Sequence, residues 1–148
     1  MREQLSQTLA TALRQADAQA RQLNQEFVGT EHLLLGMLAT AESVAHRAIK
    51  ATASPGTLRQ AVLQSLPRGA EAPLVTGRLP LSPKAQRAIS TAMAAAQAEG
   101  EPSVTTRLLL RALLEDEQLS VCQALRRSGA DLEQLMLQLS QKPAEVEK

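Results

Sequence analysis

Aromatic side chains are almost absent from this sequence of 148 residues, in which Phe27 is the single aromatic residue. Proteins that bind single-stranded nucleic acid stack bases on aromatic rings, and aromatic cages hold methylated cations, so both kinds of site are disfavoured here. Charge points the same way, because 16 Lys and Arg against 15 Asp and Glu leave a net charge of only +1. We therefore expect neither nucleic acid nor an anionic membrane as a partner.

The residues that carry catalysis and metal binding are equally scarce. Cys122 is the only cysteine, so an intramolecular disulfide is impossible and a thiolate metal site is disfavoured. The two histidines, His32 and His46, fall on different predicted helices, and no carboxylate motif accompanies them. No Gly-Lys pair is present, which excludes a phosphate-binding P-loop. We expect no metal, no cofactor and no enzymatic activity.

Long apolar runs are also missing. No segment approaches the ~20 apolar residues that span a bilayer, and the first ten residues, MREQLSQTLA, contain no apolar core of a signal peptide. A hydrophobic content of 44% nevertheless argues against disorder. The sequence predicts a soluble, cytoplasmic, globular domain.

Ala, Leu, Gln, Arg and Glu dominate the composition, and all of them favour helix. Apolar residues recur at spacings of three and four, and no strand-length alternation interrupts them. Gly36 lies inside one of these patterns, where it costs about 1 kcal/mol relative to alanine, so we expect close packing against another backbone there. The sequence predicts an all-α fold whose helices cover approximately residues 5–23, 30–38, 43–52, 54–66, 82–99, 105–114, 118–127 and 131–139.

The helical pattern occurs twice. A shift of 76 residues aligns the two halves without a gap, and it superimposes four helix starts. Twelve residues meet an identical residue 76 places further on: Leu5, Ser6, Ala12, Ala16, Ala18, Ala20, Val28, Thr30, Leu33, Leu34, Leu38 and Ala48. A four-helix unit of this size buries little core alone, so the halves are expected to pack on each other.

We therefore predict one pseudo-twofold, eight-helix domain that occupies residues 1–148. Repeat one covers residues 5–66 and repeat two covers residues 81–141. The proline- and glycine-punctuated stretch 67–80 is expected to be a linker. The polar tail, residues 142–148, is expected to be frayed.

The segment Val28–Leu38, with the sequence VGTEHLLLGML, carries a family signal together with the repeat. It resembles the N-terminal domain of the Clp unfoldases, a double Clp repeat, and the ClpC branch is most similar. The second copy, which starts at Val104, keeps the leucines but lacks the Gly, Glu and His. The resemblance implies a non-catalytic domain that receives substrate proteins or adaptor proteins and acts with a Clp AAA+ ATPase module in cis or in trans.

In the ClpC branch each repeat can bind phosphoarginine, a degradation tag. A glutamate of the GTEH motif takes the guanidinium, and a hydroxyl and amides at the start of the first helix take the phosphate. The resemblance implies a site in repeat one made of Ser6, Thr30 and Glu31. The matching residues of repeat two are Ser82, Thr106 and Arg107, and we expect that site to be degenerate because a cation at position 107 repels a guanidinium.

Each of these residues also has a purely structural explanation. Glu31 lies one residue after Thr30, the expected helix cap, where a carboxylate stabilises the helix dipole by about 0.3–1 kcal/mol. Ser6 and Ser82 are ordinary caps in this reading. Arg107 and Arg111 are spaced as a cationic pair that faces solvent. The alternatives to a recognition domain are a free-standing Clp-repeat protein that docks on a Clp machine and modulates it, or a purely structural helical module.

Overall fold

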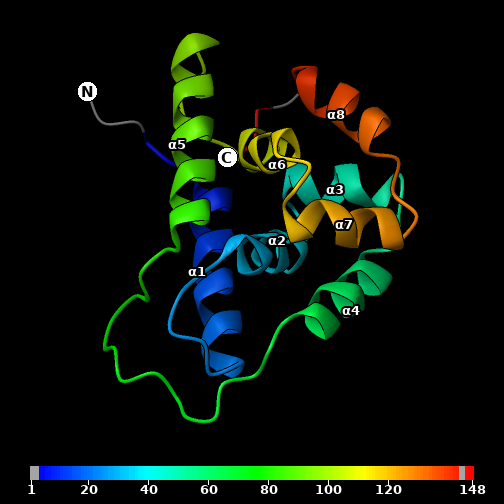
Figure 1. Ribbon diagram of the computed structural model, residues 1–148. Helices are drawn as coiled ribbons and strands as arrows, with labels where there is room; N and C mark the ends of the chain where they lie inside the picture. Colours follow the sequence, from blue (N-terminus) through cyan, green and yellow to red (C-terminus); the bar gives the residue numbers. More distant parts are fainter. Residues whose placement is uncertain (1–3, 144–145) are drawn as a thin grey trace.

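The computed structural model describes residues 4–143 and 146–148. These residues form eight helices and no strand, so the predicted all-α class is confirmed (Figure 1). The helices are α1 (Gln7–Gln22), α2 (Thr30–Leu38), α3 (Val44–Lys50), α4 (Pro55–Ser65), α5 (Pro83–Ala98), α6 (Thr106–Glu115), α7 (Ser120–Arg127) and α8 (Leu132–Ser140). None of the described helices combines the length and the apolar character needed to cross a membrane.

Most helices begin where a short polar side chain accepts a hydrogen bond from an amide three residues further along, which satisfies one free first-turn donor. Helix α2 differs from the prediction, because its N-cap is Gly29 and Thr30 is already helical. The imidazole of His32 reaches back to accept the Gly29 amide at 2.9 Å, so the cap forms without the threonine hydroxyl. The side-chain caps are Ser6, Ser43, Ser54, Ser82, Thr105 and Asp131.

Two short parallel bridges join the halves and display their symmetry. One pairs Leu5 with Val104, and the other pairs Val28 with Leu81. A shift of 76 residues converts the first pair into the second. The main-chain hydrogen bonds match as well, since Ser6 donates to Val104 at 2.8 Å and Ser82 donates to Val28 at 2.9 Å. The start of each repeat is therefore held against the other repeat.

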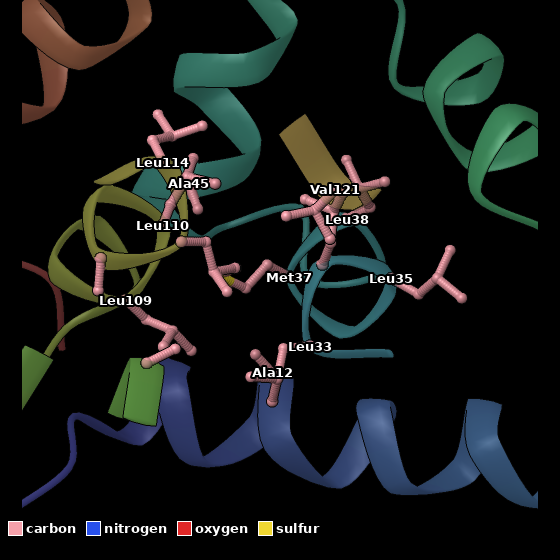
Figure 2. Close-up of a cluster of buried hydrophobic side chains, with 14 of the residues drawn as sticks. Ala12, Leu33, Leu35, Met37, Leu38, Ala45, Leu109, Leu110, Leu114 and Val121 are labelled. Atoms are coloured by element: carbon pink, nitrogen blue, oxygen red, sulfur yellow. The ribbon is translucent and has the colours of Figure 1, made fainter. Parts of the chain in front are cut away.

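The core runs continuously through both repeats. Figure 2 shows one cluster of buried side chains in which Met37 of α2 points toward α6, Ala45 of α3 lies beside Leu110, Val121 of α7 lies beside Leu38 and Ala12 of α1 lies beside Leu33. Leu34 and Leu110, one from each repeat, are completely buried. Because the two units share one interior, each completes the core that it is too small to build alone.

Gly36 lies where α1 and α2 cross. A Cβ at this position would stand 2.2 Å from the Ala12 carbonyl oxygen and 2.8 Å from the Ala16 amide nitrogen. Both atoms belong to the backbone and cannot rotate away. The predicted close approach is confirmed, and repeat two has Ala112 at the equivalent position.

The connection between α4 and α5 is a long segment that runs around the outside of the helices (Figure 1). It is tied at several points, since Gly69 donates to the Leu23 carbonyl at 2.9 Å and the Leu79 amide donates to Asp17 at 2.7 Å. Leu79 is buried against the core, whereas Leu74 is almost fully exposed.

Candidate functional site

The structure does not bring together the site residues that the sequence grouped within one repeat. Ser6, expected beside Thr30 and Glu31, instead lies at the start of α6, because the Leu5–Val104 bridge carries it there. Ser82 takes the place beside α2 through the Val28–Leu81 bridge. Each predicted site is thus a composite of both repeats, and the grouping expected from the sequence is corrected.

The first composite, here called the Glu31 site, consists of Gly29, Thr30, Glu31, Ser82 and Ser120. The Ser120 hydroxyl donates to Glu31 Oε1, and the Thr30 hydroxyl lies 3.5 Å from the same oxygen. Glu31 Oε2 and Ser82 Oγ both face the missing side chain of Gly29, at 3.1 and 3.9 Å from the position that a Cβ would take. The absence of a side chain at Gly29 therefore leaves backbone between a carboxylate and a hydroxyl.

Several polar atoms of the Glu31 site have no partner among the described residues. The Ser82 hydroxyl accepts the Ala85 amide at 3.1 Å but donates to nothing there. The first-turn amides of Thr30 and Lys84 are likewise without an acceptor in the described part of the chain, and Glu31 Oε2 accepts no hydrogen bond there. The site thus presents free donors beside one free carboxylate oxygen, which suits a ligand that carries both signs of charge.

The side chain of His32 lies next to Gly29 in the Glu31 site. Its Nδ1 accepts the Gly29 amide, so the proton of the neutral ring is on Nε2, which is buried without a partner among the described residues. Burial lowers the pKa of His32, and the nearby Glu31 carboxylate opposes this shift only in part. His32 thus acts as a hydrogen-bonding group in the first turn of α2.

The second composite, here called the Thr106 site, consists of Ser6, Thr8, Val44 and Thr106. A carboxylate of the chain itself fills it. Glu147 accepts from the Thr106 amide at 2.7 Å, from the Val44 amide at 3.0 Å and from the Ser6 hydroxyl at 3.2 Å. The prediction of a frayed tail is wrong for residues 146–148, and it lies outside the described residues at 144–145.

Arg107 and Arg111 do not face solvent, contrary to the prediction. The Arg107 guanidinium is 3% exposed and donates to the Leu139 carbonyl at 2.6 Å and to Glu101 at 3.3 Å. Arg111 binds Glu99, and this hydrogen bond is the main cause that lowers the pKa of the Glu99 carboxyl. The two cations are matched by carboxylates at the end of α5, a pairing that their own helix does not reveal.

Sequence reasoning missed several contributors to these sites, among them Ser120, Val44, Thr8 and Glu147. The shift of 76 residues relates Ser120 to Val44, so the repeat itself could have paired them once one was known. No local pattern marks either residue, because each reaches its site by helix packing across the two repeats. Nothing in the sequence distinguishes Glu147 from its polar neighbours.

The remaining reactive groups lie outside both sites. Cys122 is fully buried, and burial raises the pKa of its thiol, which disfavours the reactive thiolate. The side chain of His46, on α3, forms a hydrogen bond of 2.8 Å with the carbonyl of Leu38, on α2. Within the described residues no group of His, Cys, Asp and Glu side chains is arranged to hold a metal ion.

Comparison with known proteins agrees with this architecture. A family model described as the Clp repeat (R) N-terminal domain matches residues 4–106 and 80–148. The chain belongs to this family. As a Clp repeat domain, it resembles the Hsp104 N-terminal domain of Candida albicans, with a TM-score of 0.78 and 18% identity over 93% of this chain and 89% of that one. The N-terminal domain of ClpD from Arabidopsis thaliana gives a TM-score of 0.75 and 17% identity, over 93% of this chain and 92% of the other.

Curated relatives are much longer than this Clp repeat domain. Chloroplastic ClpC1 of Arabidopsis thaliana is 26% identical over 132 residues, which are 88% of this chain but 14% of ClpC1. A ClpA homologue of Cyanidium caldarium is 28% identical over 138 residues, or 91% of this chain and 16% of that protein. The chain thus spans only about a seventh of their length, and ClpC1 bears a chloroplastic name, so a cytoplasmic location stays a prediction.

Proposed function

We propose that this Clp repeat domain is a non-catalytic recognition domain that presents substrate or adaptor proteins to a Clp AAA+ ATPase module. Its membership of the family supports this role. A ClpV N-domain, 19% identical with a TM-score of 0.69 over 90% of this chain and 82% of that one, was solved in complex with a VipB peptide. The fold is therefore one on which a peptide can dock.

The finer proposal is that the Glu31 site binds phosphoarginine on tagged proteins. One observation carries it: Glu31 Oε2 and the Ser82 hydroxyl both lie within 4 Å of the position that a Cβ on Gly29 would take, and the Lys84 and Thr30 amides have no acceptor among the described residues. A guanidinium presents a planar fork of donors that a carboxylate accepts with charge assistance. The phosphate needs donors close by, and the starts of α2 and α5 supply them.

Because the site is built from both repeats, the serine proposed to bind the phosphate is not the one expected from the sequence. Ser82, not Ser6, is the helix-capping serine on the Glu31 side of the fold, and Lys84 adds a cation at the start of α5. In the Thr106 site the equivalent donors already hold Glu147. We therefore expect one phosphoarginine per chain.

Titration of the chain with free phosphoarginine, followed by calorimetry and by the Thr30 and Lys84 amide signals, tests the proposal. Loss of a charge-assisted hydrogen bond weakens binding by roughly tenfold or more, so Glu31→Gln should do so. Glu133→Gln is the matched control, since Glu133 is also an acidic first-turn residue, on α8, and is exposed. It should leave binding unchanged.

A second pair of variants separates ligand binding from helix capping. Ser82→Ala removes both a cap and a phosphate donor, whereas Ser54→Ala removes only the cap of α4, which also begins with proline. Only Ser82→Ala should weaken binding. Two equivalent binding events, or no binding at all, would contradict the phosphoarginine proposal.

A further inference from the structure

The last described residues form an extended contact with the Thr106 site. Glu147 is 7% exposed, although it belongs to a polar segment, and its neighbour Val146 is exposed. The Lys148 carbonyl accepts the Thr8 amide at 2.7 Å, next to the side-chain contacts of Glu147. Figure 1 shows this end of the chain beside α6.

Every described partner of the Glu147 carboxylate is a hydrogen-bond donor. Its Oε2 accepts from the Thr106 amide and the Ser6 hydroxyl, and its Oε1 accepts from the Val44 amide and the Thr106 hydroxyl. An ionised carboxylate is acceptor-only, and burying one is costly unless such donors surround it. Four donors from α1, α3 and α6 converge on one acidic group, so the site discriminates in favour of an anion.

The neighbouring cation does not supply that preference. Arg107 lines the same cavity as Glu147, Val44 and Val146. Its guanidinium donates to Leu139 and is paired with Glu101, which lines the cavity as well. The preference for an anion therefore rests on the four hydrogen-bond donors.

We propose that the Thr106 site is a binding site for an acidic peptide segment, and that residues 146–148 are its intramolecular occupant. A glutamate side chain enters the cluster of donors, and the following main-chain carbonyl accepts the Thr8 amide. An acidic segment of another protein binds here only by displacing residues 146–148. The Thr106 site is thus self-occluded, whereas the equivalent Ser82 hydroxyl and Thr30 amide of the Glu31 site have no acceptor among the described residues.

Tethering makes this occlusion effective. An intramolecular ligand on a short linker competes at an effective concentration of the order of millimolar, so a weak peptide added in trans meets a filled site. Removal of the tethered carboxylate should therefore raise the apparent affinity for such a peptide by about tenfold or more, because the competent state is no longer a minor fraction.

The test uses the full chain with Glu147→Gln, and Glu133→Gln as a control, since Glu133 is an exposed glutamate on α8 that belongs to neither site. The probe is a synthetic peptide of residues 143–148. We expect Glu147→Gln to shift the Thr106 and Val44 amide signals and to bind the peptide about tenfold more tightly than the original chain. The same peptide carrying Glu147→Gln should not bind, and Glu133→Gln should behave like the original chain.

Unchanged Thr106 and Val44 signals in Glu147→Gln, or equal peptide affinity with and without the substitution, would overturn the proposal. Hydrogen exchange of the original chain is a second measurement that needs no variant. The Thr106 amide, bonded to Glu147, should exchange more slowly than the equivalent Thr30 amide, and equal rates would also overturn the proposal. Phosphoarginine is followed at Thr30 and Lys84, so each proposal can fail separately.

Discussion

The Glu31 site and the Thr106 site have the same backbone arrangement. They differ in which part of the chain supplies the carboxylate. In the Glu31 site the acid belongs to α2 itself, and the Ser82 hydroxyl and the Thr30 and Lys84 amides lack acceptors among the described residues. In the Thr106 site position 107 is a cation, and the acid is Glu147, which lies 41 residues after Thr106 in the chain. Two equivalent parts of the fold therefore differ in chemistry. The Glu31 site contains its own carboxylate, whereas the Thr106 site binds the carboxylate of Glu147.

The difference extends into the packing behind the sites. Repeat one places buried leucines at positions 23 and 35, whereas the equivalent positions of repeat two hold the partly exposed ion pair of Glu99 and Arg111. Repeat one also has Gly36 where repeat two has Ala112. The first two helices of repeat one are therefore held together by apolar contacts and close backbone packing. The equivalent helices of repeat two are held together there by an ion pair. The following predictions compare equivalent positions.

The largest effects are expected in the shared core. Leu34→Ala and Leu110→Ala should each reduce the free energy of unfolding by about 2–5 kcal/mol, since both side chains are fully buried and a cavity remains. Chemical denaturation measures this. A loss at one position only would show that the two repeats do not share the core equally.

Gly36→Ala should destabilise the chain by about 1–3 kcal/mol, because the added methyl group meets the α1 backbone. The matched change in repeat two, Ala112→Gly, should cost only about 1 kcal/mol through helix propensity. Thermal unfolding of both variants gives the comparison. Equal tolerance at the two positions would contradict the closer approach of α1 and α2.

His32 should make the stability of the chain depend on pH. Because burial places the pKa of His32 below its ordinary value of about 6.5, the unfolded state binds more protons, and stability should fall as the pH drops below that value. His32→Gln retains a side chain that can reach the Gly29 amide but does not titrate. Unfolding measured from pH 8 to about pH 5 should show a weaker decline in this variant, and an identical profile would contradict the assignment.

The smallest effect is expected at Glu99. Its pKa is lowered chiefly by the bond to Arg111, so the stabilisation is present above the ordinary carboxyl pKa and disappears as the pH falls through the lowered value. The pair is partly exposed, so Glu99→Gln should cost no more than about 1 kcal/mol at neutral pH. Denaturation at low and high salt measures it, and a loss independent of salt would argue against an electrostatic origin.

Much of the fold was predictable because its signals are local. Spacings of three and four residues located the helices, and short polar residues marked most of their starts, since both effects act within one helical turn. The gapless shift of 76 residues indicated the two-repeat plan, and Gly36 indicated a close approach before any neighbour was known. Each inference needs only residues that are near in sequence or related by the repeat.

The sequence by itself determined the helices, the repeat and the chemical groups that each motif carries. Tertiary structure alone decided that Ser82 lies beside Glu31, that Ser6 lies beside Thr106, and that Glu147 is buried there. These partners are separated by between 41 and 141 residues, and they meet because each repeat begins by pairing with the other. No local propensity encodes that pairing, which is set by how two whole surfaces bury their apolar faces together.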